Sequence, residues 1–193
     1  MTEPAIRRMT LEEFLHWDDG TDTRYELIDG FPVAMAPPAE AHRILALRLG
    51  SRIDAALAGR RPCNAQIEPG VVRPDRADSY YVPDIAVTCE PNEPGRQLMV
   101  DPILIVEILS PSTERSDRRL KMPAYQKLDS VREIMLIDAD SYHAELYRPE
   151  NDHWGVQLVR GAEAVLSLAS VDLRISMSEP YEGIAIPAIA ADA

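Results

Sequence analysis

The chain has 193 residues, of which 46% are hydrophobic, and a formal net charge of −12 at pH 7. This length suits one domain, and the apolar content excludes wholesale disorder. The negative net charge argues against a general polyanion binder, because phosphate contacts come from Lys and Arg. It is compatible with a local basic groove, with a site that binds divalent cations, or with an acidic surface that only maintains solubility.

The first third of the chain predicts a short helix, a hairpin and a long helix. Thr10 followed by Glu13 forms a capping box, which predicts a short helix starting there. Asp29 and Gly30 separate two apolar runs and predict a tight β-hairpin turn. In the segment that follows, apolar residues recur at helical spacing, and Gly59 predicts the end of this long helix.

The rest of the chain predicts strands around one charged helix. Strands are predicted at residues 63–72, 80–89, 102–109, 132–138 and 143–149 and, from weaker patterns, at 154–160 and 164–168. A helix is predicted at residues 112–128, with Pro123 expected to end or kink a turn. The segment from Ser176 on is expected to lack regular structure. This order predicts an α/β (α+β) protein with a mixed sheet flanked by helices, in one domain over residues 1–193 with a tail at about 176–193.

The cysteines and the apolar runs bear on the compartment. Cys63 and Cys89 do not make a disulfide framework, and their flanks lack the spacing of a zinc site. The N-terminus has no apolar region typical of a signal peptide, and no run is long enough to span a bilayer. We therefore expect a cytoplasmic protein with no membrane partner.

Two carboxylates lie within predicted strands. Glu107 interrupts the apolar run PILIVEIL, where an ionised carboxylate costs several kcal/mol unless a cation or hydrogen-bond donors receive it. Asp84 lies in YVPDIAV, although Asp is disfavoured inside strands. If these strands pair antiparallel, with the midpoint between Gly95 and Arg96, the two carboxylates lie opposite each other, about 5 Å apart at Cβ.

Two opposed carboxylates repel each other unless a cation lies between them or one holds a proton. Mg²⁺ binds one or two carboxylates, keeps several waters and leaves room for phosphate oxygens. The alternative is an Asp at a strand end and a Glu paired with an internal Arg. The next predicted helix carries Lys121, with Tyr125 four residues later on the same face; alone, Lys121 would be read as a surface lysine.

Several segments occur in an order that resembles a known family. They are YELIDG, a His at the start of a helix, VPDIAV, VEILSPST, a D-x-x-x-K-x-x-x-Y pattern and VREIMLID. Together they resemble the Uma-type endonuclease family of bacteria, within the PD-(D/E)XK nuclease superfamily, over about residues 10–184. The resemblance implies a restriction endonuclease-like fold, with a mixed sheet core flanked by helices and extra hairpins.

The resemblance also implies roles for individual residues. Asp84 matches the Asp of the superfamily's "PD", and Glu107 matches the acidic residue of "(D/E)XK". The lysine of that motif is absent, because position 109 is Leu, and Lys121 matches the place to which this family has moved it. Glu26 resembles an additional acidic residue that can join the metal site.

The implied reaction is metal-assisted hydrolysis of phosphodiester bonds. Asp84, Glu107 and the backbone carbonyl of Ile108 would bind Mg²⁺ or Mn²⁺, which lowers the pKa of a bound water. His42 and Tyr125 match recurrent residues of the family and are assigned to substrate binding. DNA is the expected partner, and restriction enzymes that cut two strands suggest a homodimer by analogy.

Functions of different classes remain open. The first is a Mg²⁺-dependent DNA endonuclease, which the joint presence of Asp84, Glu107 and Lys121 favours. The second is a catalytically inactive nuclease-fold protein that serves as a binding or assembly module, which the acidic charge and the aromatic content of 6% favour. Hydrolysis of RNA or of a smaller phosphodiester would use the same site.

Overall fold

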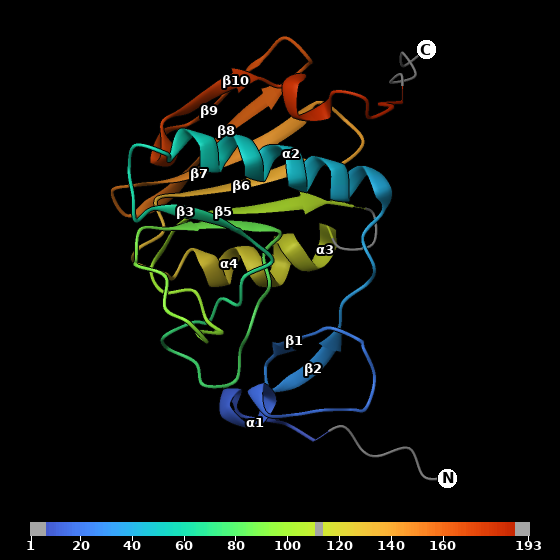
Figure 1. Ribbon diagram of the computed structural model, residues 1–193, viewed down its shortest axis with the longest axis vertical. Coiled ribbons are helices and arrows are strands. Elements are labelled where there is room, and N and C mark those ends of the chain that lie inside the picture. Colours follow the sequence, from blue (N-terminus) through green and yellow to red (C-terminus); the bar gives the residue numbers. More distant parts are fainter. Residues whose placement is uncertain (1–6, 111–113, 188–193) are drawn as a thin grey trace.

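The computed structural model describes residues 7–110 and 114–187, and its centre is a six-stranded sheet in the order β3-β4-β5-β6-β7-β8 (Figure 1). The pairing of β5 with β6 is parallel, and the other neighbours are antiparallel. The mixed sheet expected from the order of elements is therefore present. The strands are β3 (Asn64–Ile67), β4 (Ile85–Thr88), β5 (Pro102–Leu109), β6 (Glu133–Asp138), β7 (His143–Glu150) and β8 (His153–Arg160).

Helices cover both faces of the sheet, as Figure 1 shows. One face packs on α2 (Glu40–Ala56), and the other on α3 (Glu114–Ser116), the π-helical turn η1 (Asp117–Lys121) and α4 (Met122–Tyr125). From Leu104 on, the apolar side chains of β5 alternate between these two cores, and all eight residues of the strand are buried. Across the described ranges, no helix combines the length and the apolarity needed to cross a membrane.

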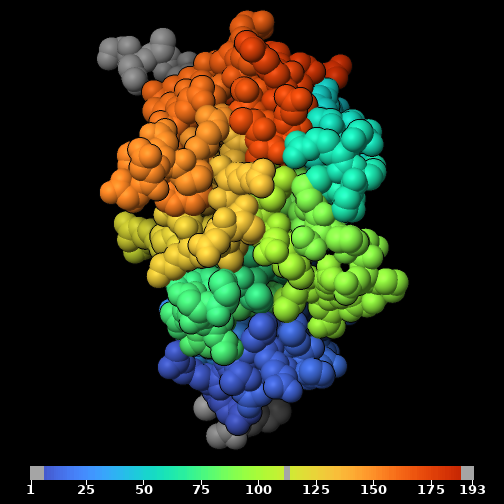
Figure 2. Space-filling model, turned by 90° about the vertical axis from the view of Figure 1, so that its left-hand side faces the viewer, coloured from blue at the N-terminus to red at the C-terminus, as the bar shows by residue number. Residues whose placement is uncertain are grey.

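The N-terminal elements form a separate layer at one end of the molecule, drawn in blue in Figures 1 and 2. The capping box and the hairpin predictions are both confirmed. The hairpin turn uses Asp29 and Gly30 at φ 51° and 83°, the left-handed region that a two-residue turn requires. Backbone hydrogen bonds in both directions between Leu27 and Tyr80 attach the hairpin to the rest of the chain. These elements are α1 (Leu11–Leu15), β1 (Tyr25–Ile28) and β2 (Phe31–Ala34).

Two predicted strands were too long. Of residues 63–72, only β3 is a strand, because Glu68 adopts φ 50° and the chain then turns away. Of residues 80–89, only β4 is a strand, while Tyr80 and Tyr81 form isolated bridges. The predicted helix at residues 112–128 is divided into three short segments from Glu114 on, and its first two residues lie outside the described residues.

The C-terminal region is more regular than predicted. A strand at Leu173–Ser176 (β10) was missed and pairs with β9 (Val165–Leu168), with the short helix η2 (Ala169–Val171) between them. The expectation of an irregular segment from Ser176 on was wrong in part, because η3 (Glu179–Tyr181) lies within it. Tyr181 is buried in the core on the α2 side, and its hydroxyl donates to the Asp138 carbonyl at 2.6 Å.

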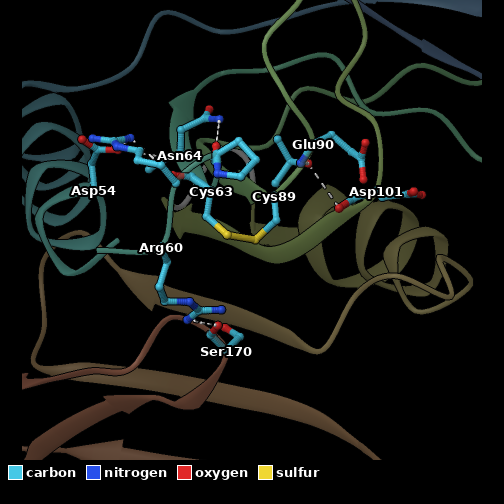
Figure 3. Close-up of a disulfide and its surroundings, with 12 residues drawn as sticks. Asp54, Arg60, Cys63, Asn64, Cys89, Glu90, Asp101 and Ser170 are labelled. Atoms are coloured by element: carbon cyan, nitrogen blue, oxygen red, sulfur yellow. Dashed lines mark hydrogen bonds and ion pairs between the residues drawn. A yellow bond between two sulfur atoms is a disulfide. The ribbon is translucent and has the colours of Figure 1, made fainter. Parts of the chain in front are cut away.

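The two cysteines form a disulfide, contrary to the expectation from their spacing (Figure 3). Asn64 and Thr88 are register partners in the β3–β4 ladder. Cys63 and Cys89 are the next residues outward on the two strands, so the antiparallel register brings them opposite each other. This correction comes from the strand register, which the linear spacing of the cysteines does not disclose.

Candidate active site

Asp84 and Glu107 converge where β4 begins beside β5. Ile85 pairs with Val106, so the same register carried one residue further places Asp84 opposite Glu107, as predicted. The register shifts only at the other end of the ladder, between Val87 and Thr88. The two carboxylates therefore lie on the face of the sheet that packs on α4.

Asp84 is held by two donors. Oδ2 accepts a hydrogen bond from the Ile108 amide at 2.6 Å, and Oδ1 lies 2.8 Å from Nε2 of His42. His42 comes from the first turn of α2, and its side chain is only 12% exposed. The observed contact of His42 is thus with the carboxylate. For Ile108 the observed contact is its amide, and metal binding through its carbonyl remains a prediction.

Lys121 lies at the centre of a group of carboxylates. Its Nζ is 3.1 Å from Oε1 of Glu26 and 3.3 Å from Oε1 of Glu107. Asp117, four residues earlier, brings Oδ1 to 3.3 Å from the same nitrogen. The Lys121 side chain is only 8% exposed, so Lys121 is not the surface lysine that the residue alone would suggest. Glu26 also accepts a hydrogen bond from the Val82 amide at 2.8 Å.

Tyr125 makes a hydrogen bond to Glu107. Its hydroxyl donates to Oε1 of Glu107 at 2.7 Å, and the tyrosine is 1% exposed. Lys121 and Tyr125 thus reach the same carboxylate from successive turns, as their spacing predicted. The observed contact of Tyr125 is with the carboxylate, and substrate binding by Tyr125 remains a prediction.

Burial and charge act against each other in this group. Burial raises the pKa of Glu107 well above its ordinary value, the Lys121 ammonium opposes that rise, and the charge of Asp84 adds to it. Burial also disfavours the charge of Lys121, but its neighbouring carboxylates outweigh burial and raise the pKa of the amine. For Tyr125, burial and then the charge of Glu107 raise the pKa of the phenol. Lys121 is therefore an ammonium throughout the physiological range.

Except for Tyr125, these groups line a pocket of about 480 Å³. One wall is the apolar segment of residues 33–39, which links β2 to α2. The polar lining consists of Glu26, His42, Glu68, Asp84, Glu107, Ser110, Ser116, Asp117 and Lys121. An opening lined by acids and one ammonium, beside an apolar wall, can admit a polar ligand to the carboxylates.

The charges in the pocket fit a divalent cation. Five carboxylates, from Glu26, Glu68, Asp84, Glu107 and Asp117, and the one ammonium of Lys121 line the pocket, which leaves an excess of negative charge. In the described part of the chain, no three His, Cys, Asp or Glu side chains form a complete metal-binding group. Two carboxylates with the remaining positions left to water are what Mg²⁺ commonly accepts, so Asp84 and Glu107 suit this ion.

Sequence reasoning missed Asp117 in this group. Its side chain is only 2% exposed, yet Asp117 enters the sequence analysis only as the first residue of the D-x-x-x-K-x-x-x-Y pattern, without a role of its own. The available signal was its spacing of four residues before Lys121, which places the two side chains on one helix face. The prediction failed because nothing in the sequence showed that this face is buried.

Comparisons with known proteins agree with this architecture. Residues 11–178 match the Uma2 family, described as "Putative restriction endonuclease". The chain is 29% identical to the uncharacterized protein slr1290 of Synechocystis, over 92% of this chain and 94% of that protein. It is 25% identical to the uncharacterized protein sll1609 of the same organism, over 88% and 97%.

A solved structure extends the comparison to the fold. The crystal structure of "a putative nuclease belonging to DUF820" from Anabaena variabilis superposes with a TM-score of 0.73 at 22% identity. The match covers 90% of this chain and 98% of that one. The six-stranded mixed sheet of this chain, with its few helices, matches the restriction endonuclease-like fold that the sequence resemblance implied.

Proposed function

Because the chain belongs to the Uma2 family, whose description indicates a nuclease, we propose that it is a divalent-cation-dependent endonuclease that hydrolyses phosphodiester bonds of DNA. One observation carries the proposal. Asp84 and Glu107 line one pocket, and the ammonium of Lys121 lies 3.3 Å from Glu107. Two acids and a cation gathered in this way are the groups that metal-assisted attack on a phosphate diester requires.

The acids are fixed before any ligand arrives. Asp84 and Glu107 would hold Mg²⁺ or Mn²⁺, which when bound supplies Lewis-acid charge beside the scissile phosphate. The two donors on Asp84 and the Tyr125 hydroxyl on Glu107 restrict how each carboxylate can rotate. Such preorganisation lowers the cost of orienting the reacting groups.

Lys121 would supply the positive charge that the motif lysine provides elsewhere in the superfamily. At the position of that lysine, Leu109 is 4% exposed and belongs to the core on the α4 side. Lys121 brings an ammonium to Glu107 from the following helix. There it would orient the attacking water and stabilise the negative charge that develops on the phosphate. Glu26 and Asp117 hold the amine in place.

Cleavage of supercoiled plasmid with Mg²⁺ or Mn²⁺ tests the proposal. Wild-type protein should nick or linearise the plasmid, and Glu107→Gln should lower the rate on the order of 10²-fold or more. Glu163→Gln, which changes an exposed glutamate far along the chain, is the matched control and should cleave like the wild type. Equal cleavage by wild type and Glu107→Gln would remove the catalytic role.

The lack of a complete three-ligand metal group among the described residues favours a second candidate, a nuclease-fold protein that binds nucleic acid or another partner without cutting it. Under this alternative, wild-type protein leaves plasmid, single-stranded DNA and RNA intact with either cation, while binding to one of them persists. Cleavage of RNA but not of DNA would retain the chemistry and change the substrate.

A further inference from the structure

Strand β8 is a long edge strand with an apolar surface. It is the last strand in the order of the central sheet and is drawn in orange in Figure 1. Val156 and Leu158 are 54% and 51% exposed, although both are large hydrophobic residues. The eight residues of β8 contain no Pro and no Lys, the residues that commonly protect an edge from pairing. Such an edge is a template for another strand.

The backbone of β8 has its free groups at alternate residues. The Gly161 amide donates to the Tyr142 carbonyl, directly beside the pairing of His143 with Arg160. Hydrogen-bonded and non-hydrogen-bonded pairs alternate along an antiparallel ladder. The even-numbered residues of β8 therefore turn their amides and carbonyls away from β7. Their side chains share one face, the face that carries the exposed Val156 and Leu158.

We propose that β8 pairs with β8 of a second copy of this chain, antiparallel about a twofold axis at Val156. In this register the outward amides and carbonyls of Val156 meet those of Val156 of the partner subunit, and Trp154 lies opposite Leu158 of the partner subunit. Main-chain hydrogen bonds join the strands, and the apolar side chains cover one another. The two six-stranded sheets become one continuous sheet.

Charge complementarity supports this register. Asp152, directly before β8, comes beside Arg160 of the partner subunit, and the twofold axis repeats this pair at the other end. Among the described residues Arg160 makes no ion pair, and Asp152, whose side chain is 99% exposed, lies 3.7 Å from Nδ1 of His153. Moving the axis to Gly155 would set Leu158 against Asp152 of the partner subunit, which opposes an apolar side chain to a charge. The inference rests on β8 and the turn before it and is independent of the nuclease proposal.

Mass measurement by light scattering gives the first test. Wild-type protein should show twice the 21.5 kDa mass of one chain, and Val156→Glu should show the mass of one chain, because the axis would place like charges opposite each other. Val165→Glu changes an exposed valine on β9 (45% exposed) and should leave the mass unchanged. A single-chain mass for the wild type, or a doubled mass for Val156→Glu, overturns the proposal.

Charge reversal and cross-linking test the register. Asp152→Arg and Arg160→Asp should each weaken the dimer, and the double variant should restore it, because each pair of opposite charges is then rebuilt. Val156→Cys should form an intermolecular disulfide on oxidation, since Cα atoms of a hydrogen-bonded pair lie about 5.5 Å apart, within disulfide range. Val165→Cys should not. No restoration in the double variant, or equal cross-linking by both cysteines, contradicts the register.

Discussion

Replacing Lys121 by Met tests the charge arrangement of the pocket without reference to any reaction. The ammonium contacts Glu26, Glu107 and Asp117 at 3.1 to 3.3 Å, and all of these side chains are at most 8% exposed. Methionine keeps the length and most of the volume of the side chain but removes its charge. The variant therefore leaves three carboxylates buried together without their cation.

Breaking a buried ion pair by removing one partner costs about 3–5 kcal/mol. For a chain of this size, about 2–4 °C of melting temperature accompany each kcal/mol, so Lys121→Met should melt roughly 6–20 °C lower than the wild type. The pKa of Glu107 is already raised by burial and would rise further in the variant. A raised pKa in the folded state makes folding take up a proton. The deficit should therefore be larger at pH 8 than at pH 5.

Urea unfolding at both pH values measures the effect. Lys127→Met is the control, because Lys127 lies two residues after α4 and is exposed, and it should change the free energy of unfolding by about 0.5 kcal/mol or less. Saturating Mg²⁺ should stabilise Lys121→Met more than the wild type, since a cation then offsets the same carboxylates. A loss below about 1 kcal/mol, or a deficit that grows as the pH falls, would refute this account of the pocket.

Three further predictions concern other contacts. Tyr125→Phe removes a buried hydrogen bond to a carboxylate and should lower the free energy of unfolding in urea by about 1.5–3 kcal/mol. The hydrogen bond from Arg118 lowers the pKa of Glu145 in the folded protein. The stabilisation from this contact is therefore present above the unfolded pKa of about 4.3 and is lost as the pH falls. Glu145→Gln should be less stable than the wild type at pH 6, and this difference should shrink at pH 3. The disulfide closes a loop over a separation of 26 residues, so changing Cys63 and Cys89 together to Ala should cost about 3–4 kcal/mol, and native unreduced protein should resist alkylation.

The central strands were predictable because their pattern is local. A run of eight residues, apolar except for Glu107, predicts β5, and the length of the loop between β4 and β5 predicts the register that places Asp84 opposite Glu107. The position of Lys121 on the helix after β5 and its spacing to Tyr125 could also be predicted from the sequence. These features depend on hydrophobic periodicity and on spacing, which the sequence carries directly.

Other features depend on tertiary contacts and could not be predicted from the sequence. The burial of Asp117 follows from where the helix packs, and the disulfide follows from the register of β3 against β4. The role of Glu26 as a partner of Lys121 depends on the docking of the N-terminal hairpin beside Val82. A sequence pattern marks these residues as charged or reactive, but their partners come from segments far away in the chain.

The central claim is that the carboxylates of Asp84 and Glu107 together bind a divalent cation beside Lys121. Anomalous diffraction from wild-type crystals soaked in Mn²⁺ tests it most directly. The account predicts an anomalous peak within coordination distance of both carboxylates, and its loss in Asp84→Asn crystals treated alike. Saturating Mn²⁺ that gives no peak between these two side chains, or gives one that survives in Asp84→Asn, would contradict it.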